Sequence, residues 1–360
     1  MRIAIVGLPN SGKTTVFNAL TRGNIETTAF SSGQLEPNLA TVKVPDQRLD
    51  QLAAIFKPKK VTPADVQYVD VAGITKGETQ KAGLPPALLN YVSSADALLH
   101  VVRAFEDDGV PHPDETVDPA RDIEAFDLEL IFSDLGIIER RLTRLKGEIG
   151  KLPAKEREIR MQEHDLLERL QSALEQDIPI RNLEISDEEW RLIRGYQFLS
   201  AKPMLVVVNI GEDQIANPPQ LSYTHSKSAI LPLSAKVEAE LAQLDDADAA
   251  AFMEDLGITE PARDLVIKKS YELLGLISFL TAGADEVRAW TIRRDLPAVE
   301  AAGAIHSDIQ RGFIRAEVVA FKDLIAAGSL TEAKKAGTLR LEGKQYIVQD
   351  GDICHFLFNV

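Results

Sequence analysis

Cysteine is nearly absent from this sequence, because Cys354 is the single one among 360 residues. One thiol cannot form an internal bridge, so a disulfide scaffold is excluded and a reducing compartment is expected. No apolar run approaches the roughly 20 residues that a membrane span needs. No secretory signal precedes the first apolar stretch, Arg2–Gly7. We therefore expect a cytoplasmic protein without a membrane partner.

Positive charge is also scarce, with 40 Lys and Arg against 55 Asp and Glu and a net charge of −15. Such a surface repels nucleic acid at long range, so any RNA contact needs a local basic patch. The stretch Arg140–Arg160 is such a reversal of sign, with eight basic residues and three glutamates. It suits either a solvated helix face or a contact with a phosphate backbone.

Short apolar runs between helical patterns dominate the chain, whose length suggests two or three domains. Such runs are typical of buried strands in a mostly parallel α/β sheet. Thr41–Val44 is shorter and suits an antiparallel edge strand. About a hundred residues follow Val102 before the next strand, too many for a loop, so they should contain an inserted unit. The five buried runs are Ile3–Val6, Val66–Val71, Ala97–Val102, Met204–Val208 and Ile230–Leu233.

The inserted unit is predicted to be helical. Its leucines and isoleucines from Leu135 to Leu152 recur at heptad spacing until Pro153 interrupts them. A second apolar face runs from Ile159 through Leu166 and Leu170 to Ala173 or Leu174. Two helices joined near Pro153 would form a protruding antiparallel arm. The alternative is an ordinary two-helix subdomain packed on the sheet.

A small α+β region is predicted from about Ser278 onward. Its expected strands are Val287–Ile292, Gln345–Val348 and Cys354–Phe358, and its expected helices are Ile305–Gly312 and Phe321–Ala327. Within it, His306, Arg311 and Arg315 suit either a binding surface for RNA or protein, or maintenance of the fold.

The strongest chemical signal is Gly7-Leu8-Pro9-Asn10-Ser11-Gly12-Lys13-Thr14, which fits the phosphate-binding loop pattern between a strand and a helix. Its backbone N–H groups and the helix N-terminus bind phosphate. Lys13 reaches the β- and γ-phosphates as a catalytic cation, and Thr14 gives its hydroxyl to Mg²⁺. The nucleotide contacts predicted here are Asn10, Ser11, Gly12, Lys13, Thr14 and Thr15. Asn10 is also a candidate ligand for K⁺ near the phosphates.

A D-x-x-G pattern, Asp70-Val71-Ala72-Gly73, ends the third apolar run. In a phosphate-loop protein, Asp70 is expected to hold Mg²⁺, and the Gly73 N–H to sense the γ-phosphate. The next residue is Ile74, which cannot orient water as the glutamine of Ras-like proteins does. His112 lies in a polar loop after the following strand, and we predict it as a second catalytic residue.

Base recognition is predicted after the next strand, at Asn209-Ile210-Gly211-Glu212. The usual guanine reader is N-K-x-D, whose Asp accepts from guanine N1–H and the 2-amino group. Here Ile210 and Glu212 replace the Lys and the Asp, which removes a main preference for guanine. Ile210 is expected to pack on the purine face. Ser234, Ala235 and Lys236 form a plausible loop that lines the base.

These motifs together resemble the YchF family, the Obg-like ATPases of the P-loop GTPase superfamily, over nearly the whole chain. The resemblance also rests on Glu36-Pro37-Asn38, Val44-Pro45-Asp46, Thr281–Thr291, Ala302–Asp308, Arg311–Glu317, Arg340–Lys344 and Val348–Asp352. It implies an ATP hydrolase with relaxed guanine discrimination, Mg²⁺ dependence and association with ribosomes. The partners we expect are ATP and the ribosome or ribosomal RNA, bound through the helical arm and the last domain, by a monomer.

The resemblance also implies a domain division. A discontinuous nucleotide-binding domain would span residues 1–125 and 200–277, a helical coiled-coil insertion 126–199, and a TGS domain 278–360. Two stretches depart from the family pattern. Ser31–Leu35 makes the first switch two residues longer, without its usual Thr, and Pro85-Pro86 stiffen the second switch. These departures favour an alternative, a nucleotide-gated binding module with little turnover. A small-molecule kinase would need an arginine-bearing lid, which the sequence does not clearly offer.

Overall fold

The computed structural model describes residues 1–23, 38–71 and 86–359. The chain divides into two compact units. The first comprises Met1–Ala40 and Gln67–Val266, and the second comprises Thr41–Val66 and Ile267–Val360. No helix within the described ranges is both long enough and apolar enough to cross a lipid bilayer.

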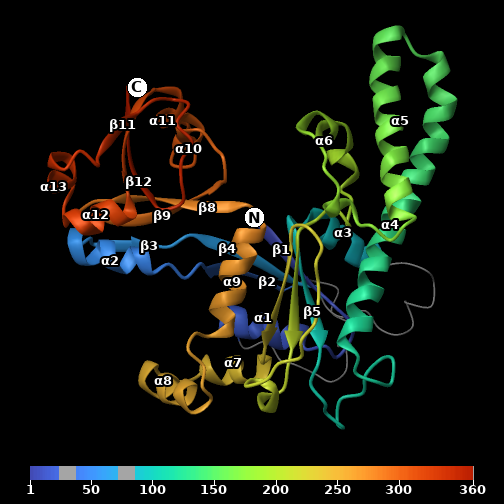
Figure 1. Cartoon of the computed structure of the whole chain (residues 1–360), viewed down its shortest axis with the longest axis horizontal. Coiled ribbons are helices and arrows are strands. Elements are labelled where there is room, and N and C mark those ends of the chain that lie inside the picture. The colour runs from blue at the N-terminus through green and yellow to red at the C-terminus, as the bar shows by residue number, and fades with distance from the viewer. Residues whose placement is uncertain (24–37, 72–85, 360) are drawn as a thin grey trace. The chain divides into compact units, whose positions relative to one another are not determined.

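The first unit is built on a six-stranded sheet with the order β2-β4-β1-β5-β6-β7 (Figure 1). The five neighbours from β4 to β7 all run parallel. All five predicted strands are present, and Thr41–Val44 overlaps the edge strand β2. The predicted burial fails for Ile230–Leu233, because β7 is an edge strand in which only Leu233 is buried. The bounds are β1 Arg2–Val6, β2 Asn38–Lys43, β4 Asp65–Asp70, β5 Ala97–Arg103, β6 Met204–Asn209 and β7 Ser228–Leu233.

Helices cover this sheet because its central strands are apolar on both faces. Val92 of α3 and Leu130 of α4 share one core cluster with Val6 and Val206 of the strands. Val16 and Leu20 of α1 are also fully buried. The helices are α1 Lys13–Thr21, α3 Pro86–Ser94, α4 Pro119–Glu148, α5 Ala154–Leu174, α6 Asp187–Ile193, α7 Ala235–Leu241, α8 Asp246–Asp255 and α9 Ala262–Leu273.

Helices α4 and α5 form the antiparallel arm that the sequence predicts (Figure 1). Helix α4 ends at Glu148, a 3₁₀ turn spans Ile149–Lys151, and Pro153 caps the start of α5. The arm has its own apolar core, in which Ile138 and Leu142 of α4 pack with Leu166 and Leu170 of α5. The heptad spacing places these side chains on facing stripes.

A buried glutamate links the two arm helices. Glu163 of α5 accepts hydrogen bonds from Arg141 of α4 at 2.8 and 3.0 Å, from Arg160 at 2.7 Å, and from the Tyr196 hydroxyl. Burial would raise the pKa of Glu163, but these bonds outweigh burial and lower the pKa to about 2. The charged carboxylate therefore stabilises the folded arm.

Replacing Glu163 by glutamine should loosen the arm in a pH-dependent way. The pKa falls from 4.5 to about 2 on folding, so the stabilisation is complete above about pH 5 and is lost toward pH 2. We expect E163Q to lower the opening free energy of arm amides by on the order of 2 kcal/mol at pH 7. Hydrogen exchange should show this difference shrink at pH 3–4. E158Q, an exposed change on the same helix, is the control; a pH-independent difference would contradict the argument.

The second unit contains a six-stranded sheet with the order β11-β10-β12-β8-β9-β3. Its strands are β3 Lys60–Thr62, β8 Leu276–Ala282, β9 Glu286–Arg293, β10 Phe313–Ala320, β11 Arg340–Glu342 and β12 Asp352–Phe358. The predicted strand Gln345–Val348 is wrong, because only Ile347 forms a bridge there, to Pro297. The helices are α2 Gln47–Phe56, α10 Ala298–Gly303, α11 Ser307–Arg311, α12 Phe321–Ala327 and α13 Leu330–Lys335.

The segment Thr41–Val66 belongs to this second unit, whereas the sequence division put it with the nucleotide-binding residues. Strand β3 pairs in parallel with β9. Arg48 of α2 binds both Asp46 and Asp350 at 2.8 Å, and Asp350 accepts from the Ser278 N–H at 2.9 Å. Two motifs far apart in the sequence thus form one polar cluster, which attaches the segment to the C-terminal sheet.

Candidate functional site

The phosphate-binding loop follows β1 and leads into α1. Gly7 and Gly12 have φ values of 146° and 91°, which side chains rarely adopt. A Cβ at Gly7 would lie 2.3 Å from the Val101 carbonyl oxygen, and one at Gly12 would lie 2.2 Å from Asn209 Nδ2. The loop is therefore held close to β5 and β6, and both glycines are needed for its path.

Lys13 lies inside this loop and is only 7% exposed. Its Nζ donates to the carbonyl oxygens of Gly7 at 3.0 Å and Leu8 at 2.7 Å. Burial lowers the pKa of Lys13 to about 8, against the opposing effect of Asp70. A phosphate would supply the negative charge that this buried ammonium group lacks.

The side chains of Thr14 and Asp70, the two predicted Mg²⁺ ligands, are in contact. Thr14 Oγ1 donates to Asp70 Oδ2 at 3.0 Å. Burial raises the pKa of Asp70, opposed by the Thr14 bond and by the charge of Lys13. Among the described residues, Asp70 Oδ1 is buried without a hydrogen-bond partner. A hydroxyl beside a carboxylate with an unused oxygen is a donor set that Mg²⁺ prefers, so these residues fit the ion.

Asn209 connects two of the predicted loops. Its Nδ2 donates to the Ser11 carbonyl oxygen at 3.0 Å, and its Oδ1 accepts from the Ala235 N–H at 3.1 Å. It is 4% exposed, at the end of β6. The phosphate loop and the Ser234–Lys236 loop are thus fixed to each other through one amide.

The remaining predicted base contacts differ in exposure. The Ile210 side chain is 5% exposed and packs in the core cluster with Ala104 and Val208. Its contact with a purine stays a prediction. Glu212 and Lys236 are exposed, and Thr15 is half-buried. Gln214, which sequence reasoning missed, pins this loop by accepting from Gly211 N–H and donating to the Ala104 carbonyl.

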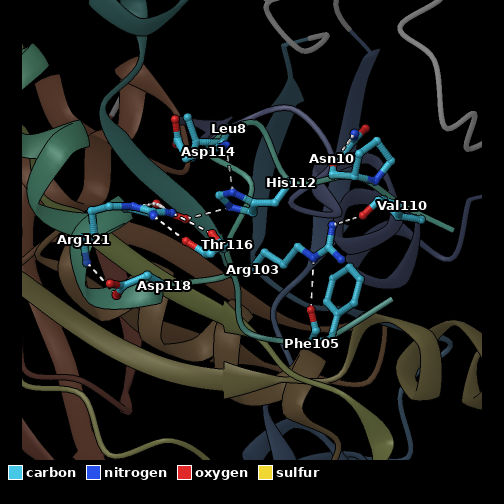
Figure 2. Close-up of polar contacts among 12 residues, drawn as sticks. Leu8, Asn10, Arg103, Phe105, Val110, His112, Asp114, Thr116, Asp118 and Arg121 are labelled. Carbon is cyan, nitrogen blue, oxygen red and sulfur yellow. Dashed lines mark hydrogen bonds and ion pairs between the residues drawn. The ribbon is translucent and has the colours of Figure 1, made fainter. Parts of the chain in front are cut away.

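A loop between β5 and α4 lies against the phosphate loop (Figure 2). Asn10 Nδ2 donates to the Pro111 carbonyl oxygen at 2.9 Å, and this contact orients the side chain predicted to bind K⁺. Next to it, His112 is 8% exposed. Its Nδ1 accepts from the Asp114 N–H at 3.1 Å, so the proton lies on Nε2, which is 3.1 Å from Asp122 of α4.

Two arginines also bind this loop, and no short sequence motif predicts their role. Arg103, at the end of β5, donates to the carbonyl oxygens of Phe105, Val110 and Asp107. Arg121 donates to Thr116 and to Asp122. Figure 2 shows both guanidinium groups directed toward the loop backbone. The loop is therefore an ordered element that joins the phosphate loop to the first turn of α4.

Gly73, Ile74, most of the first switch and most of the second lie outside the described residues. In the second unit, His306 caps α11 by accepting from the Asp308 N–H at 3.1 Å, and Arg311 pairs with Asp308. These contacts favour maintenance of the fold for both residues. Arg315 is exposed.

Comparisons with known proteins agree with this geometry. A family model described as "50S ribosome-binding GTPase" matches residues 2–133, and a C-terminal YchF GTPase model, described as a protein of unknown function (DUF933), matches residues 276–359. The ribosome-binding ATPase YchF of Bacillus subtilis is 43% identical, covering 99% of this chain and 98% of that protein. The Escherichia coli O157:H7 protein of the same name is also 43% identical, covering 100% and 99%. The solved Schizosaccharomyces pombe YchF GTPase aligns with a TM-score of 0.86 at 31% identity, over 99% and 97% of the two chains.

Proposed function

This chain belongs to the YchF family, and we propose that it is a Mg²⁺-dependent nucleoside-triphosphate hydrolase that prefers ATP and acts as a nucleotide-dependent switch on the ribosome. The curated relatives carry the name ribosome-binding ATPase. The alternative, a gated binding module with little turnover, shares the same site and differs only in rate.

The observation that carries the proposal is a group of unused polar atoms around the phosphate loop. Within the described residues, Ser11 Oγ, Asp70 Oδ1 and Ser234 Oγ are buried without a hydrogen-bond partner. Such atoms are costly in a folded protein unless a ligand completes them. They lie on the three segments that the sequence assigns to phosphate, Mg²⁺ and base, and Asp70 also interacts electrostatically with the buried cation of Lys13.

The chemistry follows from these positions. The loop N–H groups and Lys13 would bind the β- and γ-phosphates and stabilise the charge that develops as water attacks in line. Thr14 and Asp70 would hold Mg²⁺, which supplies charge neutralisation at the phosphates. Asn10 would add its amide oxygen to a K⁺ site. Both ring nitrogens of His112 are engaged with the protein, so its proposed role in positioning water requires the Asp122 pair to open.

Binding and turnover of ATP and GTP, measured side by side in K⁺ and in Na⁺ at one Mg²⁺ concentration, test this function. We expect ATP to bind more tightly than GTP, because the relatives are named ATPases and Glu212 does not reproduce the aspartate that favours guanine. We expect K⁺ to raise turnover several-fold through Asn10. A clear preference for GTP would overturn the base assignment. Tight ATP binding without turnover in either salt would establish the gated module instead.

The arm is the proposed ribosome contact, together with the C-terminal unit. Arg144, Lys146 and Lys151 are exposed near its tip, and among the described residues none of the three has an acidic partner within 4 Å. By contrast, Arg141 and Arg160 are paired with Glu163. The unpaired cations are available to a phosphate backbone, in a chain whose net charge of −15 otherwise opposes one.

Replacing Arg144, Lys146 and Lys151 together by glutamine should weaken ribosome binding. We expect the slope of log affinity against log salt to fall by roughly 2, because about three phosphate contacts are removed. Sedimentation with ribosomes at several salt concentrations measures this slope. The same change at Arg2, Arg191 and Lys227, which are exposed in the first unit outside the two arm helices, is the matched control. An equal loss in the control would mean that net charge, rather than the arm, governs the contact.

A further inference from the structure

A short loop before β6 contacts a helix of the nucleotide-binding core on one side and the arm on the other. We name residues 198–202 the hub loop. Lys202 Nζ donates to the carbonyl oxygens of Ser93 at 2.9 Å and Ala95 at 2.5 Å, at the C-terminal end of α3. Free carbonyls at a helix end need such donors, so Lys202 fixes the hub loop to α3.

The hub loop is also hydrogen-bonded to helix α4. Asp134 of α4 accepts from the N–H groups of Leu199 and Ser200, both at 2.8 Å. Asp134 and Ser200 are 0% exposed. A carboxylate buried this deeply is tolerated because two backbone donors face it. Sliding α4 past the hub loop would leave that charge unpaired.

The second arm helix is attached to the same loop. After α5, the Ile180 N–H donates to Ser200 Oγ at 3.3 Å, and the Arg181 N–H donates to the Ser200 carbonyl at 3.0 Å. The Arg181 guanidinium, fully buried, pairs with Asp127 of α4. The roots of both arm helices therefore meet at the hub loop and cannot shift independently of it.

Helix α4 runs from the loop that contacts the phosphate loop into the arm (Figure 1). The 30 residues of this helix extend about 45 Å along its axis. Near the site, its first turn holds His112 through Asp122, in the loop that contacts Asn10. Further along, Asp134 holds the hub loop, which holds α3. Helix α3 is the first described element after the D-x-x-G stretch that begins at Asp70.

We propose that the hub loop couples the nucleotide site to the arm: a displacement of α3 when nucleotide binds moves Lys202 and the hub loop, and through Asp134 and Arg181 the roots of both arm helices. This regulation rests on the proposed function, because it requires nucleotide binding. Buried polar contacts of this kind have few intermediate arrangements, so they transmit a shift rather than absorb it. If nucleotide changes the affinity of the arm for a ligand by some factor, linkage requires that this ligand changes the affinity for nucleotide by the same factor.

Hydrogen exchange of arm amides in the full-length chain tests the proposal. Exchange is compared without nucleotide, with ADP and with a non-hydrolysable ATP analogue, while calorimetry measures nucleotide affinity separately. We expect nucleotide to change arm exchange at least about fivefold in the wild type. In K202M the change should fall below about twofold while affinity stays within about threefold, because Lys202 lies away from the phosphate loop. K202R, which keeps donors for the two carbonyls, should restore the response.

K322M removes an exposed lysine of the second unit and is the matched control, with D134N as a second variant of the hub. Failure of the wild type to bind nucleotide would reject the proposed function itself. Binding without any change in the arm would reject the coupling alone. An unchanged arm response in both K202M and D134N would show that the hub loop is not the route. If K202M does not fold, D134N and the wild-type response decide the question.

Discussion

Replacing Lys13 by methionine is expected to weaken nucleoside-triphosphate binding by about 100- to 1,000-fold and to abolish measurable turnover. Lys13 is a buried cation within the phosphate loop, where its charge acts with little screening by water. Removing a buried partner of a charged hydrogen bond costs about 2–5 kcal/mol. Titration calorimetry with the ATP analogue, together with a single-turnover assay, measures both losses.

The same variant should leave the fold nearly intact, but its free energy of unfolding should depend on pH differently from that of the wild type. The pKa of Lys13 falls from 10.5 to about 8 on folding. Between these values the unfolded chain binds the proton and the folded chain does not, so this group makes stability rise with pH from 8 to 10.5. K13M should lack that rise. K322M, an exposed change in the second unit, should retain both binding and the rise. Binding by K13M within threefold of the wild type would contradict contact between Lys13 and phosphate.

Much of the first unit could be predicted because its information is local. Buried parallel strands are continuous apolar runs, and the phosphate loop needs its glycines and lysine at fixed spacing. The arm was predictable for the same reason, since the heptad spacing encodes its seam. The prediction of a strand at Gln345–Val348 was wrong, because this short apolar run forms only an isolated bridge at Ile347.

The contacts that position the site were not predictable, because they join residues that are distant in the sequence. Asp350 lies 302 residues from Arg48, and the pair explains why Thr41–Val66 joins the second unit. Pro111 contributes only its backbone carbonyl to Asn10, which no side-chain pattern reveals. Ile210 follows a polar residue at a strand end, yet the tertiary core buries it. This burial depends on residues of other strands and helices, which the local sequence does not reveal.

The largest stability effect at the site is expected for Asn209→Ala. This change leaves the Ser11 carbonyl and the Ala235 N–H without their partner in a buried setting. Each orphaned group costs about 1–3 kcal/mol, so we expect a loss of about 2–4 kcal/mol. For a unit of this size, that loss should lower the melting temperature by roughly 4–10 °C. Nucleotide affinity should fall by at least about tenfold, because the phosphate loop is no longer held ready for its ligand.

Asn209→Asp separates packing from hydrogen bonding at the same position. The aspartate keeps the shape and still accepts from the Ala235 N–H, but it turns an acceptor toward the Ser11 carbonyl and buries a charge. It should therefore be at least as damaging as the alanine variant, whereas a purely steric role would leave it close to the wild type. Asn217→Ala, at an exposed asparagine, sets the baseline. Wild-type melting and affinity in the aspartate variant would show that the amide does not hold the two loops together, and the phosphate loop would then owe its path to Gly7 and Gly12 alone.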